Sequence, residues 1–121
     1  MEKVKIATNE QIQKLGALIP AQEAYFQKVK PLISELYEII TSDDAVEITG
    51  EAPSVHSFIM SLEALNGQDQ MDQLTMSRVN EIASFEELSG NERVHEITDA
   101  LFLFTDAMIT DQHQIIMEAV R

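Results

Sequence analysis

Residues 91–120 read NERVHEITDALFLFTDAMITDQHQIIMEAV and form the longest helical pattern in the chain. Apolar side chains return every three or four positions, the spacing that keeps them on one face of an α-helix. They are Val94, Ile97, Leu101, Phe104, Met108, Ile115, Ile116 and Val120. With Asn91 as the N-cap, the pattern predicts a helix of about 30 residues, roughly 45 Å long. Alternatively, Thr110-Asp111 caps a second helix within it.

The chain before residue 91 is divided into shorter helical segments. Thr8–Gln11 has the form of a capping box, and the helix that it opens is expected to end near Pro20. Pro20 itself suits the first turn of a second helix. Pro31 either kinks this helix or starts a third, and the apolar stripe that follows ends at residues 41–44.

Two more helices are predicted between residues 50 and 90. The first begins around Pro53 and ends in a left-handed turn at Asn66-Gly67. The second is expected to be capped by Asp69 and to end at Ser89-Gly90.

Short stretches of alternating residues predict one small β-ribbon. Val4 and Ile6 alternate with polar neighbours, as do Val46 and Ile48, so the two stretches are expected to pair. The fold predicted from all these segments is all-α, a compact bundle of five or six helices with at most one short two-stranded ribbon. Residues 1–121 are expected to form a single domain.

Charge is the strongest signal in the composition. Eight basic residues face 21 acidic ones, for a formal net charge of −13, and all of the excess lies after residue 30, where three basic residues face 18 acidic ones. Such a surface repels nucleic acid and anionic membranes and attracts basic proteins and cations. We therefore expect a basic protein surface as the partner, without direct nucleic-acid binding or membrane association. The alternative is an acidic surface that serves solubility alone.

Several classes of protein are excluded or disfavoured by what the chain lacks. It has no cysteine, so disulfides, thiolate metal sites and cysteine nucleophiles are excluded. Its first residues lack the apolar core of a secretory signal, and its longest apolar run, Ala100–Phe104, is far shorter than a membrane span. Four scattered glycines do not build a phosphate-binding loop. A cytoplasmic location is the resulting expectation.

Two clusters of carboxylates lie at loops or helix ends, where a partner can reach them. The residues expected to bind the partner are Asp43, Asp44, Glu47, Glu51, Phe85, Glu86, Glu87 and Glu92. Opposite charge speeds the encounter, and apolar contact, here from Phe85, prolongs the complex. We interpret the protein as a small acidic binding module, regulatory or inhibitory, of the kind encoded by phages and mobile elements.

A second set of carboxylates suggests metal chemistry. Glu35-Leu-Tyr-Glu38 and Glu96-Ile-Thr-Asp99 each set two carboxylates three residues apart on a helix. Two such helices, packed together, would bring four hard oxygen donors to one point, where Mg²⁺ ions could bind a triphosphate. The pairing resembles the all-α nucleoside triphosphate pyrophosphohydrolases, the MazG and dimeric dUTPase group. The resemblance implies, as the alternative function, Mg-dependent pyrophosphohydrolysis with these four residues as metal ligands; the binding-module interpretation needs no cofactor and no catalytic residue.

The histidines give a weaker signal of the same kind. Glu92-Arg-Val-His95 has the spacing of one half of a carboxylate-bridged di-iron site, but the chain has no second Glu-x-x-His. His56 and His113 lack such a partner as well. We expect all three histidines to be surface or partly packed residues.

The final helix also predicts self-association. Ala100–Phe104 is apolar around the whole circumference of the helix. One small bundle is expected to leave part of it uncovered, which favours a two-fold homodimer through this helix.

Overall fold

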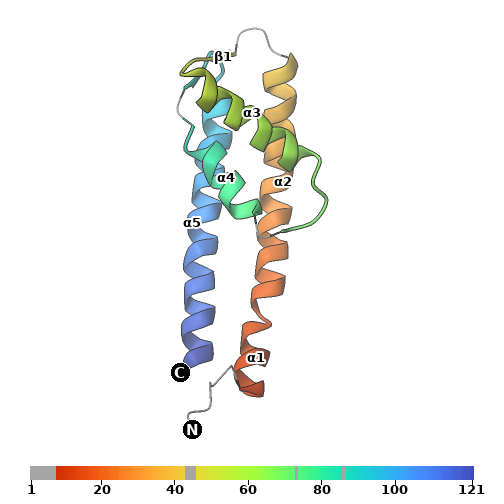
Figure 1. The fold of residues 1–121 in the computed structure, drawn as a ribbon, viewed down its shortest axis with the longest axis vertical. Helices are drawn as coiled ribbons and strands as arrows, with labels where there is room; N and C mark the ends of the chain where they lie inside the picture. Colours follow the sequence, from red (N-terminus) through yellow and green to blue (C-terminus); the bar gives the residue numbers. More distant parts are fainter. Residues whose placement is uncertain (1–7, 43–45, 73, 86) are drawn as a thin grey trace.

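Two long helices, α2 (Leu18–Ser42) and α5 (Glu92–Val120), lie antiparallel and side by side in the computed structural model (Figure 1). The described residues are 8–42, 46–72, 74–85 and 87–121. The shorter elements are α1 (Asn9–Leu15), β1 (Glu47–Ile48), α3 (Ala52–Asn66), α4 (Thr75–Ala83) and β2 (Leu88–Ser89). α3 and α4 cross one half of the long pair, whereas α1 lies beside the C-terminal half of α5 (Figure 1). The predicted all-α bundle with one short ribbon is confirmed, with five helices among the described residues.

The core lies where α3 and α4 cover the long pair. α2 contributes a stripe at steps of three and four, namely Tyr25, Val29, Ile33 and Leu36. α5 supplies Val94, Ile97, Leu101 and Met108, and α3 supplies Phe58, Leu62 and Leu65. Phe58 is fully buried, and its ring stacks on that of Phe85 with 4.3 Å between centroids. This is the apolar burial that stabilises the bundle.

One polar contact lies within the α2–α5 interface. The Tyr25 hydroxyl and the Thr105 Oγ1 are 2.8 Å apart, and both residues are buried. Each hydroxyl therefore has the partner that a buried polar group requires. Burial raises the pKa of Tyr25, which keeps its hydroxyl neutral and able to share this hydrogen bond.

The first two helices are separated at a different residue from the one expected. The capping box at Thr8 and Gln11 is confirmed, but α1 ends before Gly16 and not near Pro20. Pro20 occupies the third position of α2, where its missing N–H costs nothing because the first turn has no intrahelical acceptor. Pro31 lies inside α2, which is one continuous helix, so no third helix starts there.

The end of α3 and the start of α4 also differ from the prediction. Gly67 follows α3 with φ −84°, so the turn is right-handed. The expected cap at Asp69 is wrong, because α4 begins only at Thr75. Its N-cap is Leu74, and in the turn that leads into it Asp72 accepts a hydrogen bond from the Leu74 N–H at 2.8 Å and another from Thr75 Oγ1 at 3.0 Å.

The hydrogen bonds that Asp72 accepts in this turn are sensitive to acid. The Leu74 N–H, the Thr75 hydroxyl and other nearby donors hold the pKa of Asp72 below its usual 3.8. A lowered pKa stabilises the folded state above the unfolded value, and this contribution is lost as the pH falls through the folded-state value. We expect Asp72→Ala to lower the urea midpoint at pH 7, and its difference from the wild type to shrink below about pH 4. Glu63→Ala, at an exposed α3 position, is the control and should show no such convergence; a difference for Asp72→Ala that stays constant to pH 2 would contradict the assignment.

The long C-terminal helix is confirmed as a single unbroken element. Asn91 is its N-cap and accepts a hydrogen bond from the Arg93 N–H at 2.8 Å. Thr110 lies in mid-helix and donates its hydroxyl proton to the Asp106 carbonyl at 3.1 Å, so it does not cap a new helix.

The ribbon exists, but with another partner strand. β1 pairs with β2 in antiparallel register, Glu47 opposite Ser89 and Ile48 opposite Leu88. The expected partner strand, with Val4 and Ile6, lies outside the described residues. The signal for β2 was too weak to predict, because two residues are too few for a pattern of alternation.

Candidate functional site

The β1–β2 ribbon unites the two carboxylate clusters that the sequence places about forty residues apart. The Thr49 N–H donates to the Glu87 carbonyl at 2.9 Å and extends the ladder by one rung beyond the paired strands. Glu47 therefore lies on one strand of the ribbon, and Glu87 immediately precedes the other. The ribbon sits at one end of the α2–α5 pair (Figure 1). We call Glu47, Glu51, Glu87 and Glu92 the acidic end.

All four carboxylates of the acidic end are exposed. Among the residues that the structure describes, no ion pair involves Glu47, Glu51 or Glu92. The other expected carboxylates, Asp43, Asp44 and Glu86, lie outside the described residues. Exposed carboxylates close together on one end of a protein produce an attractive field for a basic ligand.

Two glycines shape this end of the molecule. Gly50 follows β1 with φ +114°, and Gly90 follows β2 with φ +97°. Both angles lie in the region that favours glycine, so each strand can turn directly into the helix that comes next. Glu51 is then the N-cap of α3, and Glu92 is the first residue of α5. A carboxylate in either place also interacts favourably with the helix dipole.

Phe85, the apolar residue of the expected binding site, packs partly into the core. Phe85 is half-buried because one face of its ring stacks on Phe58. Beside it, a cavity of about 440 Å³ opens between α3 and α4, lined by Pro53, Ser54, Ser57, Phe58, Glu81, Ser84, Phe85 and Glu87. Glu81 accepts hydrogen bonds there from Ser57 Oγ and, at 2.7 Å, from Ser61 Oγ. Phe85 and Glu87 thus line the same cavity, an arrangement that their positions in the sequence do not predict.

Two of the four carboxylates expected in the alternative metal site lie close together. Glu35 lies on α2 and Glu96 on α5, and the Arg93 guanidinium lies between them. Arg93 Nε is 2.5 Å from Glu35 Oε2, and its Nη1 is 3.1 Å from Glu96 Oε2. Hydrogen bonds to these two carboxylates raise the pKa of Arg93. The Arg93 guanidinium thus neutralises Glu35 and Glu96 at the place where the metal interpretation requires a Mg²⁺ ion.

Glu38 and Asp99, the other two proposed ligands, are exposed. His56, His95 and His113 are exposed as well, as expected. Within the described part of the chain, no group of three or more histidine and carboxylate side chains is arranged to hold a metal ion. No described helix is both long enough and apolar enough to cross a membrane.

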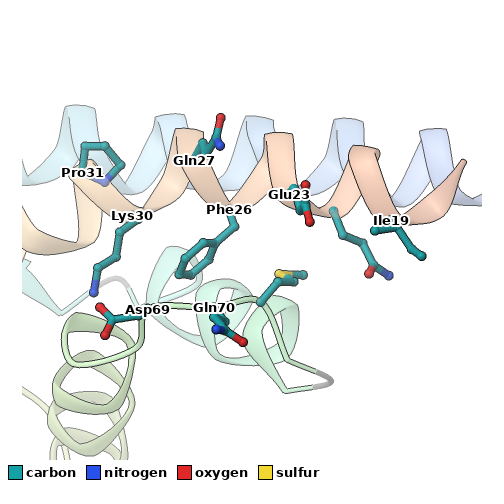
Figure 2. Close-up of a pocket in the computed structure, with 10 residues that line it drawn as sticks. Ile19, Glu23, Phe26, Gln27, Lys30, Pro31, Asp69 and Gln70 are labelled. Carbon is teal, nitrogen blue, oxygen red and sulfur yellow. The ribbon is translucent and has the colours of Figure 1, made fainter.

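A second and larger hollow, which the sequence did not predict, lies between α2 and the segment after α3 (Figure 2). Its volume is about 780 Å³, and Phe26 and Lys30 of α2 face Asp69 and Gln70 across it (Figure 2). The Lys30 Nζ donates to the carbonyl oxygens of Leu65, at 2.9 Å, and Asn66. Lys30 therefore caps the C-terminus of α3, where a cation also suits the helix dipole. Its role is structural.

The chain matches no known protein family, no curated protein and no solved structure. The fold and the site geometry are therefore the basis for a function.

Proposed function

We propose that this protein is a small acidic binding module that docks on a basic protein surface through its acidic end. The observation that carries the proposal is the β1–β2 ribbon, which unites two carboxylate clusters from distant parts of the sequence at one exposed end. Such modules regulate or inhibit a partner by covering its basic surface, and phages and mobile elements use proteins of this kind. A cytoplasmic location belongs to the same proposal.

Electrostatics supports a basic partner. The net charge of −13 draws cationic surfaces from a distance, and the acidic end concentrates part of that charge on a short ribbon. Arg93 is the basic residue closest in sequence to Glu92, and its guanidinium is paired with Glu35 and Glu96. Long-range attraction of this type raises association rates and weakens as salt increases.

The cavity beside Phe85 supports a defined docking mode. Charge alone gives fast but short-lived complexes, and apolar contacts slow dissociation. The cavity is lined by Phe85, whose ring is half-buried, and by the exposed Glu81 and Glu87. A long basic side chain such as arginine suits this combination, because its stem is apolar and its guanidinium can donate hydrogen bonds to carboxylates or stack on an aromatic face.

The test is capture of a partner from a host lysate by the immobilised protein, at low and at high salt. We expect a protein with a basic surface to be retained at about 50 mM salt and released at about 500 mM, since the Debye length falls well below 10 Å. Salt-resistant capture of a neutral or acidic protein would contradict the proposal.

The alternative, Mg-dependent nucleoside triphosphate pyrophosphohydrolysis, is favoured by one observation. The two helices that carry Glu35 and Glu96 do pack side by side, and both carboxylates reach the same guanidinium. Release of pyrophosphate from a nucleoside triphosphate with Mg²⁺, abolished by Glu35→Gln or Asp99→Asn, would replace the binding proposal. Capture of a basic partner that survives both substitutions would support the binding module.

A further inference from the structure

The end of the molecule away from the ribbon is only a helical hairpin. α1 and the start of α2 lie on one side of the C-terminal half of α5, and α3 and α4 do not reach this half (Figure 1). A hairpin covers only one face of each of its helices. Six large apolar side chains of α5, four of them in this half, are between 45% and 64% exposed: Phe102, Leu103, Ile109, Ile116, Met117 and Val120.

Four of these side chains follow the period of a coiled coil. Steps of four and three residues alternate along one stripe of α5, which we call the outer seam. It consists of Phe102, Asp106, Ile109, His113, Ile116 and Val120. This spacing defines the contact positions of a helix that packs along another helix. Leu103 and Met117 flank the seam and widen its apolar surface.

The outer seam is distinct from the stripe that α5 buries within its own chain. The buried stripe includes Leu101, Thr105, Met108 and Ala119. Each outer-seam residue Phe102, Asp106, Ile109 and Val120 comes one position later, which is about 100° around the helix. A helix in a four-helix bundle has two adjacent neighbours, so two contact stripes about a quarter turn apart are the expected pattern. Along its C-terminal half, α5 packs within the chain on α1 and α2 and carries the contact positions for a further helix on another face.

We propose that the outer seam packs antiparallel against the same seam of a second copy, so that two hairpins form a four-helix bundle. The charge distribution favours this direction. A parallel pair would set two acidic ends side by side, at a high cost in repulsion. An antiparallel pair holds them roughly 55 Å apart, several Debye lengths at physiological salt.

The seam is also complementary to itself in this direction. When Phe102 of one copy faces Val120 of the other, Ile109 faces His113, and Asp106 lies one layer from His113 of the second copy. The two-fold axis repeats each contact, so the approach of Asp106 to His113 of the other copy occurs twice in the interface. Polar residues at contact positions of a coiled coil fix its register, as these two would.

The area is sufficient for a dimer. About half of the surface of six large apolar side chains amounts to several hundred Å² per copy, which approaches the roughly 800 Å² per partner of a standard interface.

The first test is the mass of the full chain in solution, which does not depend on any partner. Sedimentation at about 100 µM should give twice the 13.6 kDa of one chain, an affinity well within reach of an interface of this size. Ile116→Glu should raise the dissociation constant by about a hundredfold or more, because in this register each new carboxylate would be buried opposite Asp106 of the second copy. Met60→Glu is the matched control, since Met60 is 54% exposed on α3 and should leave the dimer intact. A monomeric wild type, or equal loss in both variants, would overturn the proposal.

The second test is the direction of the helices, and the absence of native cysteine makes it simple. A mixture of the single variants Phe102→Cys and Val120→Cys should form a disulfide-linked dimer on oxidation, whereas each variant alone should not. Covalent dimers of each variant alone would show a parallel pair and overturn the antiparallel seam. Failure of these tests would leave partner capture at the acidic end unaffected, because that site lies at the opposite end of the molecule (Figure 1).

Discussion

Replacing Phe58 by alanine should lower the free energy of unfolding by about 3–5 kcal/mol, the usual range for a buried phenylalanine. Phe58 is 0% exposed and stacks on Phe85, so truncation leaves a cavity between α3 and the segment after α4. The bundle is small, and a loss of this size is a large part of the total stability of most domains. Urea denaturation followed by circular dichroism measures it.

The matched control for this prediction is Met60→Ala. Met60 lies two residues away on the same helix and is 54% exposed, so its truncation should change the stability by no more than about 0.5 kcal/mol. Equal effects of the two substitutions would mean that α3 does not bury the face described here. Phe58→Ala should also weaken partner capture, because Phe58 and Phe85 both line the cavity beside the acidic end.

Reversing two charges at the acidic end should have the largest effect on binding. We expect the double variant Glu47→Lys/Glu51→Lys to slow association with a basic partner by about 10- to 1000-fold at low salt, the range of electrostatic steering. Both side chains are exposed, so the fold should tolerate the change. Stopped-flow or surface-binding kinetics with the captured partner measures the association rate.

The control variant is Glu23→Lys/Glu63→Lys, which reverses two exposed carboxylates on α2 and α3. Both double variants change the net charge from −13 to −9, so they differ only in position. The association rate of this control variant should fall far less than that of Glu47→Lys/Glu51→Lys. If the two variants lose the same amount, net charge rather than the acidic end attracts the partner.

Most of the fold was predictable because helices are local structures. The extent of α5, its cap at Asn91 and the part of its stripe from Val94 to Met108 follow from neighbouring residues and are confirmed, whereas Ile116 and Val120 of the predicted stripe are exposed. The errors fall where a local signal is ambiguous. Pro20 suits either a helix end or a first turn, and Asp69 is a good capping residue although the helix begins only at Thr75.

The site was predictable residue by residue, but not as an arrangement. Sequence patterns located the carboxylates around Glu47 and Glu87 separately. Their juxtaposition depends on the pairing of Glu47–Ile48 with Leu88–Ser89, a long-range contact with no local signature. The same limit applies to Arg93, since nothing in the sequence joins it to Glu35, 58 residues away. Long-range pairing is decided by packing, which single residues do not encode.

Hydrogen exchange of the protein with and without its captured basic partner is the most direct test of the binding site. We expect the added amide protection to be greatest at residues 46–51 and 87–92, around the Thr49 N–H that bonds to the Glu87 carbonyl. Protection should be unchanged at residues 19–31, which line the hollow of Figure 2. Added protection confined to that hollow or to the outer seam, with none on the ribbon, would contradict docking through the acidic end.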